Sequence, residues 1–246
     1  MVDAFAGEKG VAKAARRRGF RAWAFEIADG PEGDLTNPAV LRRIRRAARR
    51  GQIACMVMGP PCSSFSQARN STGRLRSPEY PRGLPQQRFF SALDRKRIRD
   101  GNATLNAAIT LIKICSEFNI PYAFENPHTS IMWHDRELQR ALRQTSAIKC
   151  VVSHCGFGAR WRKNTIFMLG NCTSHDLYGL ADESFRCRGT HGRCSFRRGK
   201  HLQLGFRGAG ACAKDYAPTA TAAEYPPRLC SLLVRALTSN IDFPRV

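Results

Sequence analysis

The feature that most constrains the fold is the alternation of short apolar runs with longer amphipathic segments. Apolar runs of strand length occur at Val2 to Phe5, Ala22 to Ile27, Ile53 to Met58, Tyr122 to Phe124 and Thr165 to Leu169. Segments with helical spacing lie between or after them, at Asn37 onwards, Ala103 to Phe118 and Arg228 to Leu237. Strands that alternate with helices indicate βα units. The sequence therefore predicts an α/β fold with a doubly wound, mainly parallel sheet.

One amphipathic segment is defined by its start and by its two faces. Pro38 follows Asn37, which is the order expected where a helix begins. One face of this helix is an apolar stripe made of Val40, Leu41, Ile44 and Ala48. The rest of its surface is covered by arginines, namely Arg42, Arg43, Arg45, Arg46, Arg49 and Arg50. The stripe is expected to face the core. The arginines are expected either to contact a polyanion or to form an ordinary solvated face.

Two short runs place reactive side chains directly after predicted strands. They are Gly59-Pro60-Pro61-Cys62-Ser63-Ser64-Phe65-Ser66 and Phe124-Glu125-Asn126-Pro127. Open α/β sheets carry their reactive groups on turns at the carboxyl ends of strands. A thiolate at Cys62 and an acid at Glu125 suit addition to an electrophilic ring with protonation of that ring. The alternatives are a buried, inert cysteine and a glutamate that caps a turn.

Further short motifs lie in series with these two runs. Asp3-Ala4-Phe5-Ala6-Gly7-Glu8-Lys9-Gly10 opens the chain, and Ala24-Phe25-Glu26 and Gly33-Asp34-Leu35 follow it. The basic run Arg160-Trp161-Arg162-Lys163 precedes the last predicted strand. Taken in this order, the motifs resemble those of the DNA (cytosine-5) methyltransferase family. The resemblance extends from Asp3 to about Leu169.

The resemblance implies a fold, a cofactor and a reaction. The fold would be that of S-adenosylmethionine-dependent methyltransferases, and the reaction would be methyl transfer to C5 of cytosine in DNA. Cys62 would form the covalent adduct, Glu125 would protonate the ring, and Arg162 and Lys163 would contact the nucleotide. The implied S-adenosylmethionine site comprises Asp3, Phe5, Ala6, Gly7, Gly10, Glu26, Asp34 and Pro60. The structural alternatives are a tight strand-to-helix turn, solvated carboxylates and a solvated basic turn.

The charge balance indicates a polyanionic partner. Forty Lys and Arg residues stand against nineteen Asp and Glu residues, a formal net charge of +21. Neutralising phosphates releases condensed counterions, so DNA is the expected partner and RNA is the first alternative. A second alternative is an inactive copy that only binds nucleic acid, favoured by Lys9 at a position where the family usually has glycine. A membrane is not expected, because no apolar stretch approaches the roughly 20 residues that span a bilayer.

A segment rich in Gly, Arg, Cys and His follows the last predicted strand. It runs from Asn171 to Ala223 and contains Cys172, His175, Cys187, His191, Cys194 and His201. Scattered reduced cysteines are the default interpretation, and a structural zinc bound by Cys172, Cys187, Cys194 and His201 is the alternative. The expected division is a catalytic domain over 1–170, this small recognition insert over 171–223 and a returning C-terminal helix over 224–246.

Two further expectations follow from cysteine chemistry and loop composition. A thiolate nucleophile fits a reducing compartment, so the protein is expected inside the cell, and in the nucleus if the source is eukaryotic. No apolar secretory core is found near Met1. The stretch from Gln67 to Gly101 lacks periodicity and is rich in Arg, Ser and Pro. By resemblance, this stretch would be a mobile loop that closes over the substrate.

Overall fold

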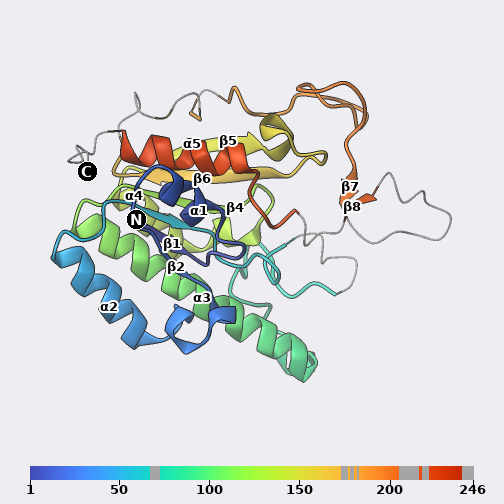
Figure 1. Ribbon diagram of the computed structural model, residues 1–246. Helices are drawn as coiled ribbons and strands as arrows, with labels where there is room; N and C mark the ends of the chain where they lie inside the picture. Colours follow the sequence, from blue (N-terminus) through green and yellow to red (C-terminus); the bar gives the residue numbers. More distant parts are fainter. Residues whose placement is uncertain are drawn as a thin grey trace.

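The structure is a computed structural model that describes residues 1–66, 73–172, 177, 180, 181, 183–204 and 222–239, and the backbone alone at 216 and 217. A six-stranded sheet forms its centre (Figure 1). The strands are β1 (Val2–Ala4), β2 (Trp23–Phe25), β3 (Met56–Met58), β4 (Tyr122–Pro127), β5 (Ile148–Ser153) and β6 (Asn164–Gly170). They are short and mostly buried, as the apolar runs predict.

The strand order places a ligand-binding position at one edge of the sheet. The order is β2-β1-β3-β4-β6-β5, with β1 to β4 parallel and β6 antiparallel to both of its neighbours. The chain leaves β1 in one direction to reach β2 and then returns to pair β3 on the other side of β1. Such a reversal opens a crevice at the carboxyl ends of the strands. We call this side of the sheet the carboxyl edge.

Helices cover both faces of the sheet, so the predicted doubly wound α/β fold is confirmed. One face packs against α2 (Pro38–Arg49), α3 (Ala92–Glu117) and α4 (Arg136–Gln144). The other packs against α1 (Gly10–Arg17) and α5 (Pro227–Thr238), as Figure 1 shows. Strand side chains alternate between the two layers, since Met56 and Met58 join the first while Val57 joins the second.

Three features of the fold differ from the sequence prediction. The strand β5 and the helix α4 were not predicted. The helix α3 begins at Ala92 instead of Ala103, because Ser91 accepts a hydrogen bond from the Asp94 amide and caps it. Residues 92–101 are therefore helical and do not belong to a loop. Positions 67–72 of the predicted loop lie outside the described residues.

The buried arginine Arg76 fixes the described part of this loop. Its side chain is only 2% exposed and stacks over the Phe65 ring at 3.9 Å. Its guanidinium donates to the carbonyls of Ser64, Pro81 and Ile98 and to the side chains of Ser64 and Asn102. Gly101 on α3 lets this cluster approach, since a Cβ there would lie 2.3 Å from Ser64 Oγ. The turn that follows Cys62 is thereby held against α3.

A second, smaller unit projects beyond the carboxyl edge. Residues 183–204, which we call the Cys/His segment, form bends and a short hairpin, and β7 (Gln203–Leu204) pairs with β8 (Tyr216–Ala217). In Figure 1 this unit and the start of α2 lie well apart. The division into domains at 170 and 223 stays a prediction. Among the described residues, no helix combines the length and apolar character needed to cross a membrane.

Candidate active site

Cys62 lies on the turn that follows β3, and a hydrogen bond ties this turn to the neighbouring strand β4. The Asn126 side chain donates from Nδ2 to the Pro60 carbonyl at 3.0 Å, which joins the turn after β3 to β4. The Phe65 amide donates to the Cys62 carbonyl at 2.9 Å, and the Phe65 ring is fully buried. These bonds hold the half-buried thiol at the carboxyl edge.

Glu125 lies within β4, next to the same edge, and its two oxygens differ. The side chain is 5% exposed. Its Oε2 accepts a hydrogen bond of 2.9 Å from the Tyr225 hydroxyl. Its Oε1 lies 3.7 Å from Lys163 Nζ, is buried, and has no hydrogen-bond partner among the described residues. A buried oxygen without a hydrogen bond costs free energy, so Oε1 is suited to meet a substrate atom.

Lys163 joins this group because β6 runs antiparallel. The strand β6 begins at the carboxyl edge, so Lys163, the residue directly before β6, lies at that edge. Burial raises the pKa of the Cys62 thiol, the Lys163 ammonium opposes that effect, and the Glu125 carboxylate adds to it. Cys62, Glu125 and Lys163 are therefore close enough to interact electrostatically, and the sequence had singled out all three.

Tyr225 and His154 belong to the same site, and the sequence prediction gave neither a role. Tyr225 is partly buried, and burial of its hydroxyl together with Glu125 raises the pKa of that hydroxyl. A Cβ at Gly59 would lie 2.5 Å from this hydroxyl, so a larger residue there would displace Tyr225. His154 is fully buried, and burial followed by Lys163 lowers its pKa to about 3, so it is neutral. Both of its ring nitrogens lack partners among the described residues.

Tyr225 carried a readable signal and His154 did not. Tyr225 stands directly before Pro226 and Pro227, where α5 starts, and proline at that position indicates a helix start in the sequence. His154 follows β5, a strand that the sequence did not reveal.

The first turn of the chain provides a second part of the site. Phe5 and Gly7 both have positive φ, 57° and 47°, and the space beside Gly7 is open. The Gly7 amide donates to Glu26 Oε2 at 2.7 Å, and the Ala6 amide donates to the Phe25 carbonyl at 3.0 Å. The ends of β1 and β2 thus meet around a carboxylate. Glu26 keeps acceptor capacity for ligand hydroxyls, so these residues fit a nucleoside-bearing cofactor.

Three other residues predicted to bind the cofactor have structural contacts of their own. Asp3 is buried and accepts a hydrogen bond from the Ala12 amide in the first turn of α1 at 2.9 Å. Gly10 allows α1 to approach α5, since a Cβ there would lie 3.0 Å from Cys230 Sγ. Asp34 accepts from the amide and the hydroxyl of Thr36, which closes its own turn.

Arg162 and Cys172 do not join the groups to which the sequence assigned them. Arg162 donates to the carbonyls of Cys187 and Gly189 and thus contacts the Cys/His segment. Cys172 follows the end of β6, where its thiol donates to the Gly170 carbonyl at 3.3 Å. Instead, Cys155 joins the cluster of potential metal ligands, which is Cys155, Cys187, Cys194 and His201. Of the other predicted histidines, His191 lies outside this cluster and His175 lies outside the described residues.

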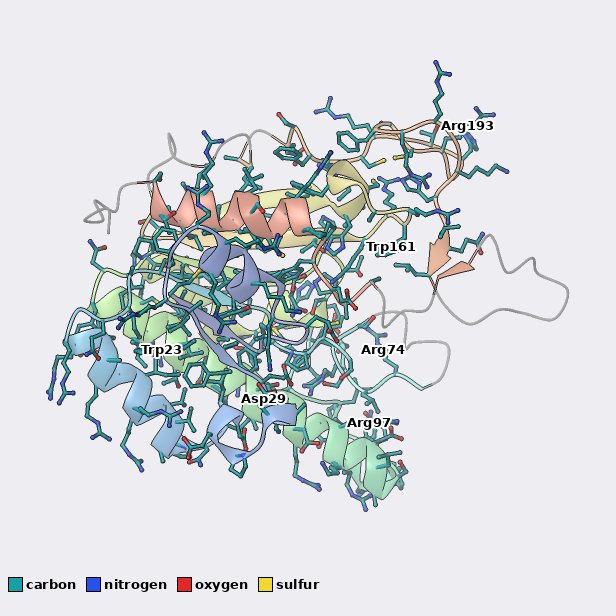
Figure 2. The ribbon with its side chains drawn as sticks, in the orientation of Figure 1. Trp23, Asp29, Arg74, Arg97, Trp161 and Arg193 are labelled. Atoms are coloured by element: carbon teal, nitrogen blue, oxygen red, sulfur yellow. The ribbon has the colours of Figure 1, made fainter. Side chains whose placement is uncertain are left out.

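Two cavities flank the sheet and neither is lined by Cys62. One, of about 840 Å³, lies along β2 and α2 and reaches Lys9, Asp29 and Gly33 near the first turn. The other, of about 530 Å³, lies between α4 and β6. Trp23 and Asp29, which line the first cavity, are labelled in Figure 2, where Trp161 lies toward the Cys/His segment. The first cavity therefore borders the cofactor part of the site.

Comparison with known proteins gives little beyond the fold. No family model and no curated protein matches the chain. Among solved structures, the S. pombe Dnmt2 methyltransferase matches with 12% identity and a TM-score of 0.41, over 75% of this chain and 56% of that one. The chain thus spans just over half the length of that structure. Any functional conclusion has to come from the site itself.

Proposed function

We propose that this chain is an S-adenosylmethionine-dependent methyltransferase that acts on C5 of cytosine in DNA through a covalent adduct of Cys62. The observation that carries the proposal is the grouping of a thiol, a carboxyl and an ammonium group at one sheet edge. Cys62 comes from the turn after β3, Glu125 from β4, and Lys163 from the start of β6. Addition chemistry on a cytosine ring needs these groups together.

The residues divide the proposed reaction between them. The Cys62 thiolate adds to C6 of the ring while Glu125 holds a proton at N3 through Oε1, the oxygen that has no hydrogen bond among the described residues. Electron density moves to C5, which would take the methyl group from the bound sulfonium as its S–CH3 bond breaks and a neutral thioether leaves. Transfer of the C5 proton to water and expulsion of the Cys62 thiolate would restore the aromatic ring. Lys163 favours the thiolate over the thiol, and Tyr225 orients the Glu125 carboxyl.

The proposed cofactor contacts involve residues whose polar atoms or neighbouring space remain available to a ligand. S-adenosylmethionine, when bound, would supply the methyl group as a sulfonium electrophile. Glu26 would accept hydrogen bonds from ribose hydroxyls, and the open turn at Gly7 would allow close approach of the ligand. Pro60 stands two residues before Cys62, on the turn that follows β3, and β3 pairs with β1, which leads into the Gly7 turn.

Nucleic acid as the substrate is supported by charge. The net charge of +21 favours a polyanion, and a base must leave its stack before a buried thiol can reach it. The proposed location of the protein is a reducing compartment, because the described cysteines are all free thiols.

The test is covalent trapping on 5-fluorocytosine. Fluorine at C5 cannot leave as a proton, so the adduct persists once methyl transfer has occurred. With S-adenosylmethionine present, the wild-type chain should form a denaturation-resistant complex with duplex DNA that contains this base. Cys62→Ser should form none, whereas Cys172→Ser, which changes a thiol away from the site, should form as much as the wild type.

Each outcome of trapping has a defined meaning. Trapping on the corresponding RNA alone would keep the chemistry and replace DNA by RNA as the substrate. Absence of any adduct, together with no cofactor binding by calorimetry, would leave a chain that only binds nucleic acid. A persistent adduct in Cys62→Ser would show that another residue is the nucleophile.

A further inference from the structure

Four side chains with metal-binding atoms converge where the Cys/His segment meets the sheet. Cys155 lies on the 3-10 turn His154–Phe157 that follows β5, and Cys187, Cys194 and His201 lie in the segment. One ligand atom of each residue lies within 4.8 Å of the others. Thirty-one positions separate Cys155 from Cys187, so the fold and not local spacing creates this group.

The geometry of the cluster fits a tetrahedral zinc ion. Cys187 Sγ and His201 Nε2 are 3.6 Å apart. Zn–S bonds of about 2.3 Å and Zn–N bonds of about 2.0–2.1 Å at tetrahedral angles require an S···N edge of about 3.6 Å. The cluster therefore already has the spacing that coordination imposes along this edge.

The surrounding hydrogen bonds prepare two of the ligands for a metal. His201 Nδ1 lies 2.9 Å from the Gly192 carbonyl, so Nδ1 carries the proton and Nε2 has a free lone pair. The amide and hydroxyl of Ser195 both point at Cys187 Sγ, at 3.5 and 3.4 Å. Donors that face a sulfur stabilise it as a thiolate, the form that binds zinc.

Backbone contacts hold the four residues in place. The Ser153 amide donates to the Phe185 carbonyl, and the Cys187 amide donates to Ser153 Oγ, which brings Cys187 beside Cys155. The Cys194 amide donates to the Gly199 carbonyl and the His201 amide to the Gly192 carbonyl, which closes a hairpin that carries both residues. In Figure 2, Arg193 marks the outer end of this hairpin.

The segment lacks the apolar interior that would hold such a hairpin together. Within residues 183–204, Cys187 alone is buried. One apolar contact of the segment with the body is the stacking of Phe185 on Phe157, with ring centroids 4.5 Å apart. Units this small and open need a staple such as a disulfide or a metal.

We propose that Cys155, Cys187, Cys194 and His201 bind one structural Zn²⁺ ion. Four protein ligands leave no coordination position for water or substrate, which is the arrangement of a structural site. A disulfide would use two of the three sulfurs and leave the third and the imidazole without a function. The ion would fasten the segment to the turn that carries His154, next to Lys163. This inference does not depend on the proposed methyl transfer.

The test measures metal directly in the full-length chain. After expression without added zinc and purification under a metal-free reductant, elemental analysis should find about one zinc per chain. Cys155→Ser should lose that zinc, while Cys172→Ser should keep it. Cobalt substituted for zinc should give the intense visible bands of a tetrahedral site together with thiolate charge-transfer absorption.

A second variant covers the case in which Cys155→Ser does not fold. Cys155→His keeps four ligands and should retain one cobalt, with weaker thiolate charge-transfer absorption because one sulfur becomes nitrogen. Two results would overturn the site: wild-type protein that holds no zinc and gives no tetrahedral cobalt spectrum, or zinc lost from Cys172→Ser and kept in Cys155→Ser. Unchanged charge-transfer absorption in Cys155→His would also remove Cys155 from the ligand set.

Discussion

The surroundings of Cys62 and of Cys155 show how neighbours decide what a cysteine does. Both residues lie on turns that follow strands at the same edge of the sheet. Cys62 has one ammonium group and one carboxyl group beside it, whereas Cys155 has two further thiols and an imidazole. The first environment suits a nucleophile that attacks and leaves. The second suits a permanent ligand. The same side chain at comparable positions of one sheet is thus expected to perform opposite tasks.

The two sites also differ in what holds them. The Cys62 turn is anchored by buried side chains, Phe65 and Arg76, in the main body. The Cys/His segment depends on backbone bonds and on the proposed ion. Changes at the first site should alter rates without altering metal content. Changes at the second site should first alter the metal content and leave the rates unaltered.

The largest expected effect is at Glu125. Glu125→Gln preserves shape and removes the proton that Oε1 would supply, so the methylation rate should fall by about 10²- to 10⁴-fold, as for general acids. Single-turnover methyl transfer measures the change, and zinc content should stay constant. Glu137→Gln, an exposed change on α4, is the control. An unaltered rate would show that Glu125 has only a structural role. The contrast between a reactive site at Cys62 and a structural site at Cys155 would then be lost.

The second effect concerns Asp3, where burial acts on a carboxyl as it does on the Cys62 thiol. Burial raises the pKa of Asp3 from 3.8 to about 7. Between these values the folded chain binds more protons than the unfolded chain, so stability is full below about pH 4 and is lost as pH rises through about 7. Asp3→Asn removes this loss, which amounts to at most about 4 kcal/mol at pH 8.

Urea unfolding at pH 4 and pH 8 tests the Asp3 prediction. The variant should gain stability over wild type at pH 8 and not at pH 4, whereas the exposed change Asp100→Asn should show no such difference between the two pH values. A gain that is equal at both pH values would contradict burial as the cause.

The third effect isolates the ammonium group beside Cys62. Lys163→Gln should raise the thiol pKa further and cut the thiolate fraction at pH 8 by roughly tenfold for each unit of change. Alkylation of Cys62, followed by peptide mass spectrometry from pH 7 to 10, should show the whole profile displaced to higher pH. Arg162→Gln is the matched control, since its guanidinium contacts carbonyls of the Cys/His segment. Equal displacement in both variants would refute the specific effect of Lys163.

The smallest effect compares two sets of arginines in DNA binding. Replacing Arg188, Arg193 and Arg198 of the Cys/His segment by Gln should reduce the salt slope by about 2–3, because each phosphate that is no longer neutralised lowers it by about 0.9. Replacing Arg42, Arg46 and Arg49 on α2 should reduce it by less than about 1. The end of α2 lies away from the carboxyl edge (Figure 1). A larger reduction from the α2 set would place the duplex along that helix.

Much of the body could be predicted from local patterns. The apolar runs located the strands from β1 to β4 and β6, and Pro38 located the start of α2. The helix α4 was also readable, since Asp135 caps it by accepting from the Leu138 amide. Because α4 was not predicted, the strand that follows it, β5, was not predicted either.

What could not be predicted depends on strand direction and register. Because β6 is antiparallel, residues before it reach the carboxyl edge and those after it do not. Its seven residues, Asn164–Gly170, carry Cys172 roughly 20 Å away from that edge. The local pattern also could not choose between Arg162 and Lys163, since adjacent residues in extended backbone point to opposite sides. The ligand role of Cys155 required all of these facts together.

The buried guanidinium of Arg76 limits how the Cys62 turn could be moved to another protein. One side chain joins the turn, the following loop and α3, so the peptide from Gly59 to Ser66 does not carry its own shape. A graft of that peptide alone would place the thiol on a turn without its support. The smallest transferable unit therefore includes Arg76 together with Gly101 and Asn102, and lysine in place of Arg76 would supply too few donors to complete it.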